Sequence, residues 1–310
     1  MAVKRLTFDL TLAAVRPIVA GLDPRLKPTG IERLHGGSTE VFLVKLMGSA
    51  PLIVKLYGDT PEWLPAKEAL VAGWVSRHID VPVPRWLIRD ESRIHLPLRY
   101  ALTSWLPGVT VDTLKGDVRI TDLYRQAGQL LRCVHRISMP AYGYVQHEGI
   151  ARPYTSNTAL MDAAFNDVFR RFRATGGDES LAQRLETLAA DRTVLAASTG
   201  PVLCHDDFHQ NNLLAAEHGD GLQLSGLLDF GNARAADPLF DLAKTLFIMA
   251  HQDPASREPL LAGYGRLDQP CATEALRLYL LYHRLNMWAF LSQLGDKPDA
   301  LLADITSMVG

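Results

Sequence analysis

The chain has 310 residues, of which 47% are hydrophobic and 21% are charged, so it can bury a large core in two domains or in one domain with two lobes. Its 32 Lys and Arg residues nearly balance its 34 Asp and Glu residues, which argues against nucleic acid or an anionic membrane as a partner. Three distant cysteines without a C-x-x-C pair argue against a disulfide framework or a zinc ribbon, and they favour a reducing, cytoplasmic location.

The N-terminus carries Lys4 and Arg5 before an apolar run, a pattern that superficially resembles a secretory signal peptide. Asp9 and Arg16 interrupt the run, and no small-residue cleavage site follows it, so a signal peptide is disfavoured. No stretch approaches the about 18 to 20 uncharged apolar residues that a membrane helix requires. We therefore expect no membrane segment.

The first part of the chain is rich in strand-like runs, with one helical pattern between them. The helical pattern extends from Glu62 to His78, and the strand-like runs are "VFLVKLM", "PLIVKLY", "PRWLIR" and "RYALTSW". These patterns predict a mostly antiparallel sheet with one main helix over residues 1–104.

Long amphipathic helical patterns dominate residues 105–310, and a Pro-Gly pair breaks the pattern at a boundary near 104–109. Thr121 is the expected N-cap of the first of these helices. Short strands are expected only around residues 202–230. The predicted helices cover residues 121–137, 157–177, 179–198, 237–247, 271–295 and 298–309. The predicted fold class is α+β with two lobes.

The segment "VLCHDDFHQNNLL" concentrates polar residues in otherwise apolar surroundings. One interpretation is a zinc hydrolase, because His205 and His209 have the spacing of an H-E-x-x-H helix, with Asp206 at the glutamate position. The sequence disfavours such a helix, because Asn211 and Asn212 are weak helix formers and the flanking residues are typical of short strands. Zinc is therefore the least favoured alternative.

A kinase catalytic loop explains more of these residues. His205, Asp207 and Asn212 have the spacing of H-R-D-L-x-x-x-N, and "DFG" follows at residues 229–231. If "EHGDGLQL" forms a hairpin that turns on residues 220–221, Asn212 lies opposite the aspartate of "DFG". The hairpin predicts that two oxygen ligands suited to Mg²⁺ lie side by side.

The segments "VLCHDDFHQNNLL" and "GLLDFGNARAADPLFDLA" resemble the signature of the aminoglycoside phosphotransferase and choline kinase family. The resemblance extends to "RLHGGSTEVFLVK", which is similar to a nucleotide-covering hairpin, and to "LIVKLY", "AKEALVAGWV" and "LTSWLPGVTV". It implies a two-lobed protein-kinase-like fold, with ATP between the lobes, that phosphorylates a hydroxyl of a small molecule. Only the first thirty residues or so and the last helices lack a matching motif.

The resemblance implies a role for several residues in binding ATP. Lys55 is expected to hold the α and β phosphates and Glu68 to hold Lys55, although Glu62 is also available. The hairpin residues are expected to let backbone N–H groups approach phosphate. The further ATP-binding residues that the resemblance implies are Gly36, Gly37 and Ser38 in the hairpin and Ser104, Trp105 and Leu106 at the hinge.

The resemblance also implies the catalytic and metal-binding roles. Asp207 is expected to accept or orient the proton of the acceptor hydroxyl, and Asn212 and Asp229 are expected to bind Mg²⁺. His205 and Asp241 are expected to support the catalytic loop. His209 has no assigned role.

Two departures from related kinases are visible. Asp206 stands where the family commonly has glycine, so an extra negative charge lies near the expected metal site. Only a short link follows Gly231 and no A-P-E motif is present, so a protein kinase is disfavoured.

The acceptor is the least determined part of the prediction. Acidic residues after Thr245 are nearly cancelled by basic ones, and Tyr279, Tyr282, Trp288 and Phe290 suit a core better than a sugar site. We expect ATP and a small hydroxylated acceptor as partners, with aminoglycoside-type antibiotics as the leading acceptors. The alternatives are a choline- or homoserine-type metabolite kinase, a nucleotide-binding pseudokinase and, last, the zinc hydrolase. The oligomeric state stays open.

Overall fold

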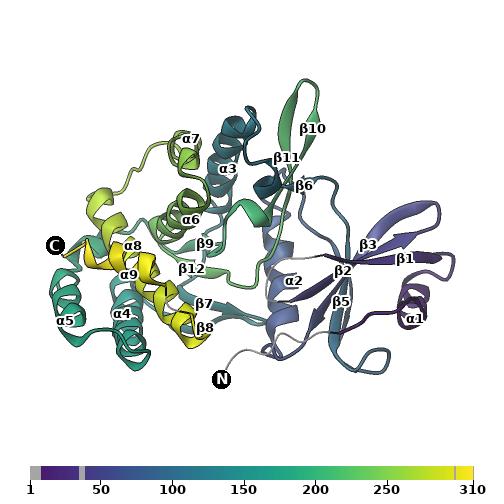
Figure 1. The fold of residues 1–310 in the computed structure, drawn as a ribbon, viewed down its shortest axis with the longest axis horizontal. Coiled ribbons are helices and arrows are strands. Elements are labelled where there is room, and N and C mark those ends of the chain that lie inside the picture. Colours follow the sequence, from purple (N-terminus) through teal and green to yellow (C-terminus); the bar gives the residue numbers. More distant parts are fainter. Residues whose placement is uncertain (1–7, 35–38, 297, 310) are drawn as a thin grey trace.

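The first part of the chain is built on an antiparallel sheet of five strands in the order β1-β2-β3-β5-β4 (Figure 1). The computed structural model describes residues 8–34, 39–296 and 298–309. The strands are β1 (Pro28–Leu34), β2 (Glu40–Leu46), β3 (Ser49–Tyr57), β4 (Trp86–Asp90) and β5 (Arg99–Ser104). Each of the four runs that were predicted as strands forms one, and the predicted main helix is α2 (Leu64–Val75).

The two faces of this sheet are covered by different helices. On one face, Val54 of β3 belongs to an apolar cluster with Val15 and Ile18 of α1 (Leu12–Leu22), a helix that the sequence patterns did not predict. Because side chains alternate along a strand, Lys55 points to the opposite face, on which Glu68 of α2 lies. Strand β3 lies between β2 and β5, so Lys55 belongs to a central strand and not to an exposed edge.

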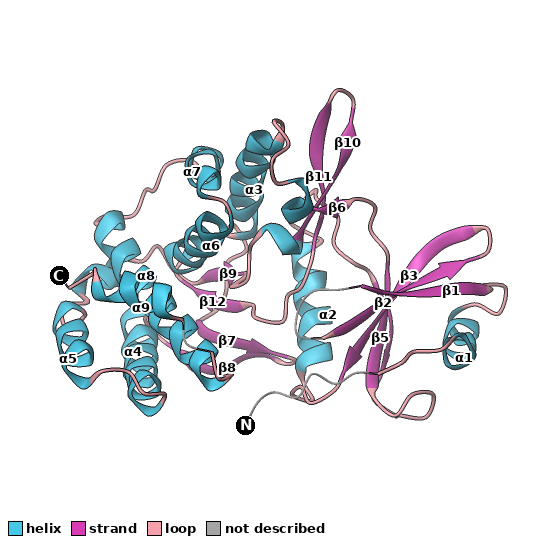
Figure 2. Ribbon diagram, in the orientation of Figure 1, coloured by secondary structure: helices cyan, strands magenta, loops and turns pink. Residues whose placement is uncertain are grey.

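The rest of the chain is mainly helical, as predicted, and Figure 2 shows the helices gathered beyond the five-stranded sheet. The helices are α3 (Ile120–Val134), α4 (Asn157–Ala174), α5 (Glu179–Leu188), α6 (Pro238–Gln252), α7 (Arg257–Tyr264), α8 (Ala272–Gln293) and α9 (Asp299–Thr306). Of the helices in the described ranges, none combines the length and the apolar character needed to span a membrane.

Two small sheets lie between the five-stranded sheet and the helices, in the orders β11-β10-β6 and β8-β7-β12-β9. Their strands are β6 (Val109–Thr110), β7 (Tyr142–Gln146), β8 (Gly149–Tyr154), β9 (Val202–Cys204), β10 (Leu213–His218), β11 (Gly221–Leu227) and β12 (Arg234–Ala236). The prediction of strands only around 202–230 is therefore wrong. Strands β7 and β8 form a local hairpin that turns on residues 147–148, and β7 also pairs with β12, some ninety residues away.

Two predicted helix ends also need correction. Arg119 and not Thr121 precedes α3, and Thr121 lies inside its first turn. The helix predicted over 179–198 ends at Leu188, because the Asp191 side chain accepts the backbone N–H of Thr193 at 3.0 Å and the chain turns there.

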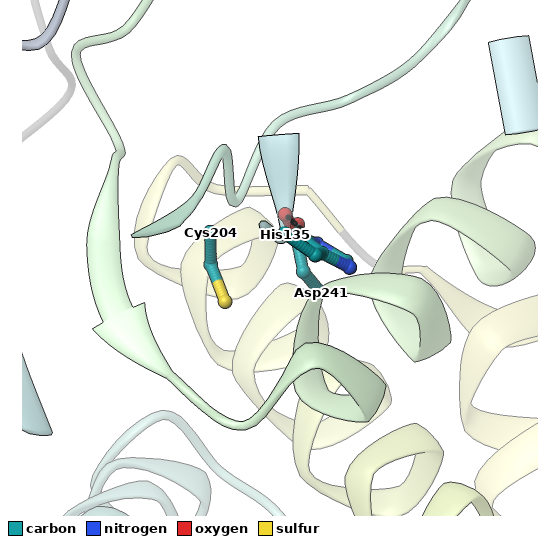
Figure 3. Close-up of side chains that lie close together, drawn as sticks. All are labelled: His135, Cys204 and Asp241. Atoms are coloured by element: carbon teal, nitrogen blue, oxygen red, sulfur yellow. Dashed lines mark hydrogen bonds and ion pairs between the residues drawn. The ribbon is translucent and has the colours of Figure 1, made fainter. Parts of the chain in front are cut away.

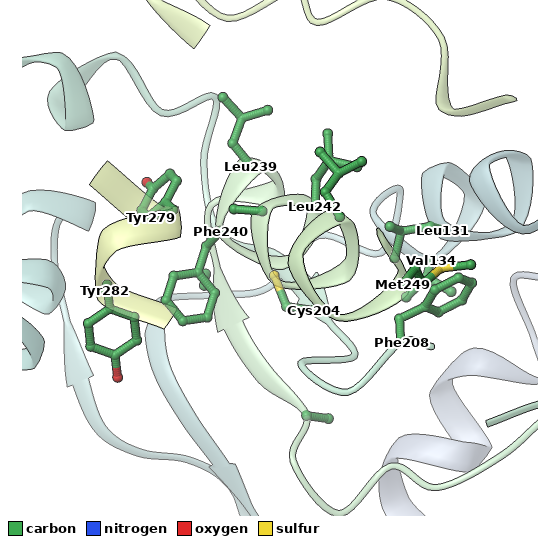
Figure 4. Close-up of a cluster of buried hydrophobic side chains, with 14 of the residues drawn as sticks. Leu131, Val134, Cys204, Phe208, Leu239, Phe240, Leu242, Met249, Tyr279 and Tyr282 are labelled. Atoms are coloured by element: carbon green, nitrogen blue, oxygen red, sulfur yellow. The ribbon is translucent and has the colours of Figure 1, made fainter. Parts of the chain in front are cut away.

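The helical core supports the loop that follows β9. Phe208 of that loop is buried beside Leu131 and Met249, and Phe240 of α6 packs against Tyr279 and Tyr282 of α8 (Figure 4). These two tyrosines and Trp288 are core residues, whereas Phe290 is half exposed.

Candidate active site

Three segments that are distant in sequence converge on the Lys55 ammonium group. Lys55 Nζ lies 2.7 Å from Glu68 Oε2 and 3.6 Å from Asp229 Oδ1. The Tyr57 hydroxyl also donates to Glu68 Oε2, at 3.1 Å. Burial alone would lower the pKa of Lys55, but the carboxylates of Asp229 and Glu68 raise it above its usual value. Lys55 is therefore a buried cation, paired with Glu68 of α2, whereas Glu62 precedes that helix and is exposed.

Asp241, in the first turn of α6, anchors the backbone of the loop after β9. Its carboxylate accepts the backbone N–H groups of His205 at 2.6 Å and of Asp206 at 2.9 Å. His135, at the end of α3, lies with Nε2 3.1 Å from Asp241 Oδ2. Burial would raise the pKa of Asp241, but the hydrogen bond from His135 and the loop N–H groups keep it below its usual value. Asp241 is a charged anchor for the loop backbone.

His135, Cys204 and Asp241 bring a nitrogen, a sulfur and an oxygen to within 4.8 Å of one another (Figure 3). Burial raises the pKa of the Cys204 thiol well above its usual value, so the thiolate that a metal requires is disfavoured. The Asp241 oxygens are already used by two backbone N–H groups and by His135. The cluster is suited to supporting the loop and not to binding a metal.

His205 and His209 do not share a helix. His205 is buried and its Nε2 lies 2.9 Å from the Leu228 carbonyl oxygen, and burial lowers its pKa. His209 Nδ1 accepts the backbone N–H of Asn211 at 3.3 Å, next to a short 3₁₀ turn at Gln210–Asn212. The helix on which the zinc interpretation depends does not form.

Asp207 lies beside Asn212. The Asn212 Nδ2 group donates to the Asp207 carbonyl oxygen at 2.9 Å and lies 3.5 Å from Asp207 Oδ2. Burial would raise the pKa of Asp207, but contact with His209 and the charge of Lys244 hold it at about 2. Asp207 is therefore ionised at neutral pH and can accept a hydrogen bond from a hydroxyl.

The predicted register of the hairpin is wrong by one residue near the site. His218 pairs with Gly221, so the turn falls on residues 219–220, and Gly219 has the left-handed φ of +57°. The register shifts once more between Leu214 and Ala215, so that Leu213 pairs with Leu227. Leu228 and not Asp229 lies opposite Asn212, and its N–H donates to the Asn212 carbonyl at 2.9 Å.

Asp229 follows directly, with a left-handed φ of +59°. The charge of Lys55 lowers the pKa of Asp229, and the negative charge of Asp207 opposes this shift.

Residues 30–279 match the model of the phosphotransferase enzyme family. The chain belongs to this family. The resemblance to the aminoglycoside phosphotransferase and choline kinase family is thus confirmed, and the enzyme is a small-molecule kinase.

Two relatives match parts of the enzyme. An aminoglycoside 3'-phosphotransferase of Escherichia coli is 26% identical over 200 residues, which cover 63% of this chain and 67% of that relative. An N-acetylmuramate/N-acetylglucosamine kinase of Caulobacter vibrioides is 26% identical over 156 residues. That match covers 47% of this chain and 42% of the relative, so it spans less than half of that protein.

A solved structure shares the whole fold. A thermostable mutant of aminoglycoside phosphotransferase APH(4)-Ia, in ternary complex with ADP and hygromycin B, superposes with a TM-score of 0.69. The two chains are 17% identical, and the alignment covers 96% of each. This likeness confirms the two-lobed protein-kinase-like α+β fold.

The expected hinge of the enzyme runs from β5 to β6. The Ser104 hydroxyl accepts the backbone N–H of Arg85 at 2.9 Å, and Trp105 is 36% exposed. Leu106 covers Gly226 of β11, where an added Cβ would lie 2.9 Å from Leu106 Cδ1. The hairpin residues Gly36, Gly37 and Ser38 lie outside the described residues.

Sequence reasoning missed the two cations that meet Asp206. Arg234 NH2 of β12 lies 2.5 Å from Asp206 Oδ2, and Lys244 Nζ of α6 lies 3.1 Å from Asp206 Oδ1. The signal was present, because Asp241 and Lys244 are three residues apart and so share one face of α6. Burial of an acidic residue such as Asp206 also requires positively charged partners nearby.

Proposed function

We propose that the enzyme transfers the γ-phosphoryl group of ATP, with Mg²⁺, to a hydroxyl of a small molecule, and that aminoglycoside-type antibiotics are its leading acceptors. The observation that carries the proposal is that Asp229, which pairs with Lys55, directly follows Leu228, whose backbone N–H donates to the carbonyl of Asn212 in the loop that bears Asp207. Phosphoryl transfer depends mainly on positioning groups and neutralising charge, and these residues supply both signs of charge at one place.

The residues present fit a nucleotide bound with a hard cation. Asp229 offers a carboxylate and Asn212 an amide oxygen, and oxygen ligands of this kind suit Mg²⁺. Bound there, Mg²⁺ would neutralise charge on the phosphates. In this proposal Lys55, paired with Glu68, binds phosphate oxygens, and the ionised Asp207 orients the acceptor hydroxyl and takes its proton.

We also propose that ATP binds between the lobes, with the hinge near residues 104–109 separating residues 1–104 from 105–310. In this proposal Ser104, Trp105 and Leu106 form the first part of the hinge and contribute to ATP binding. His205 and Asp241 act through the loop backbone and the Leu228 carbonyl, so they are positioning residues.

A second acceptor class is favoured by one specific observation. The relative from Caulobacter vibrioides is an N-acetylmuramate/N-acetylglucosamine kinase, which supports a primary-metabolite hydroxyl as an alternative to an antibiotic. Both acceptor classes use the same phosphoryl-transfer site.

The test is to incubate the purified enzyme with Mg²⁺, ATP and a panel of aminoglycosides, macrolides, choline, homoserine and amino sugars. ATP consumption and the product mass are then measured. We expect an acceptor-dependent gain of one phosphoryl group. An enzyme that binds ATP but modifies nothing in the panel would favour the pseudokinase alternative.

A further inference from the structure

Asp206 has an unusual backbone for a residue with a side chain. Its φ is +55°, in the left-handed region that glycine adopts freely, and the family commonly has glycine at this position. The side chain is buried, with 2% of the residue exposed, directly before the proposed catalytic Asp207. A buried carboxylate in strained backbone persists only where its surroundings hold it.

Two cations hold the Asp206 carboxylate. Arg234 approaches one oxygen at 2.5 Å from β12, and Lys244 approaches the other at 3.1 Å from α6. The Lys244 ammonium also donates to the Asp206 backbone carbonyl. Because β12 is paired with β7 and β9, and α6 also supplies Asp241, the loop is fixed from two sides.

Lys244 faces the next aspartate as well. Its Nζ lies 3.9 Å from Asp207 Oδ1, whereas its ion pair with Asp206 Oδ1 is shorter, at 3.1 Å. Two neighbouring carboxylates therefore compete for one buried ammonium group, and Asp206 has the shorter contact. Attraction between charges grows as distance and local dielectric fall, so loss of either partner would change the position of the other.

We propose that Asp206 and Lys244 are a positioning pair for Asp207, in which Asp206 retains the Lys244 ammonium and so leaves the Asp207 carboxylate available to the acceptor hydroxyl. The inference rests on the proposed function of Asp207. In this proposal the aspartate at position 206, where the family commonly has glycine, contributes to the activity of the site. It also implies that removing the Asp206 charge is harmful because Lys244 then pairs with Asp207.

The test compares Asp206→Asn, Lys244→Met and the double variant with the parent enzyme. Asparagine keeps the size of aspartate and tolerates left-handed backbone, so the turn is preserved. We expect Asp206→Asn to lower kcat by about tenfold or more while the KM for ATP stays within about twofold. Replacing Lys244 as well should restore part of the lost kcat, because the competing cation is gone.

The matched control is Lys115→Met. Lys115 also donates to a backbone carbonyl, that of Gln252, but it is exposed and Gln252 lies at the opposite end of α6 from Asp241. Its kcat should equal that of the parent. Equal losses of kcat, ATP affinity and thermal stability in Asp206→Asn, with no recovery in the double variant, would mean a purely structural role and would overturn the inference.

A crystal structure of Asp206→Asn gives a readout that needs no acceptor. We expect Lys244 Nζ to close on Asp207 Oδ1 to about 2.8 Å, the distance of a charged hydrogen bond. An unchanged separation would overturn the pairing. A parent enzyme that phosphorylates no acceptor would instead contradict the proposed function, and the crystal structure would still decide the pairing.

Discussion

Asp207 and Asp229 are the two carboxylates of the proposed site, and they have different neighbours. Asp207 lies beside the Asn212 amide in the loop after β9, whereas Asp229 faces the ammonium group of Lys55, a residue of the five-stranded sheet. These different neighbours predict that substitution of each aspartate impairs a different step of the reaction. Asp207 should matter to the acceptor hydroxyl, and Asp229 should matter to the nucleotide and its cation.

Asp207→Asn should preserve the fold and ATP binding and remove the group that takes the hydroxyl proton. General-base contributions lead us to expect a fall in kcat of about 10² to 10⁴, with little change in the KM for ATP. Steady-state kinetics with an identified acceptor measures both. A variant that keeps near-parent turnover would show that the catalytic loop is wrongly assigned.

Asp229→Asn should weaken nucleotide binding itself, because it removes a charged oxygen ligand and a partner of Lys55. We expect ATP affinity in the presence of Mg²⁺ to fall by about 10- to 100-fold. Calorimetric titration with and without Mg²⁺ checks this, and Asp220→Asn on the exposed hairpin turn is the control. The same Mg²⁺ dependence in parent and variant would contradict the assignment.

Among the elements, α3 and α7 pack unusually closely. A Cβ added at Gly128 of α3 would lie 2.0 Å from the Leu260 carbonyl oxygen, and one added at Gly263 would lie 1.9 Å from the Arg125 carbonyl oxygen. Both obstacles are backbone atoms, which cannot move aside as a side chain can. The two glycines therefore allow the close approach of α7 to α3, the helix that directly precedes His135.

Gly128→Ala should destabilise the enzyme although alanine is the better helix former. The overpacking leads us to expect a loss of about 2 to 4 kcal/mol in the free energy of unfolding. Gly21→Ala in α1, where an added Cβ meets no atom within 4 Å, should instead gain about 0.5 to 1 kcal/mol. Urea unfolding of both variants measures this. A stable Gly128→Ala protein would mean that the helices separate easily.

Across the whole molecule, α2 joins the sheet of the first lobe to the second lobe. Glu68 faces Lys55, and the preceding Lys67 is fully buried with its Nζ 3.5 Å from the centre of the Tyr144 ring of β7. Tyr144 in turn donates to the Gly231 carbonyl at 3.1 Å. The helix that orients Lys55 is thus packed directly against the second lobe.

Lys67 gives this junction a pH dependence. Burial, with the nearby Arg234, lowers the pKa of Lys67 from 10.5 to about 7. Below about pH 7 both folded and unfolded chains carry the proton and the cost of burying the charge is present in full, and the cost falls as pH rises toward 10.5.

We therefore expect Lys67→Met to raise the free energy of unfolding by about 1 to 3 kcal/mol near pH 6, with a smaller gain near pH 9.5. Denaturant unfolding at both pH values tests it. The exposed Lys45→Met on β2 should change stability by less than about 0.5 kcal/mol at either pH. A gain from Lys67→Met that does not depend on pH would show that Lys67 is not neutralised by burial.

Patterns within short windows of the sequence predicted much of this protein. Alternating apolar residues predicted the strands around Lys55, helical periodicity predicted α2, α4 and α8, and the spacing from His205 to Asn212 with "DFG" predicted the family. These features succeed because propensity, periodicity and motif spacing act between residues that are close along the chain.

Only the tertiary structure decided the contacts between distant segments. The choice of Glu68 over Glu62, the pairing of β7 with β12 and the cations that meet Asp206 depend on how elements pack together. The hairpin register was also predicted wrongly, because the turn falls one residue earlier and the pairing shifts again between Leu214 and Ala215. Such contacts form between residues far apart in sequence, and their energies come from burial and charge in the folded molecule, which no local pattern contains.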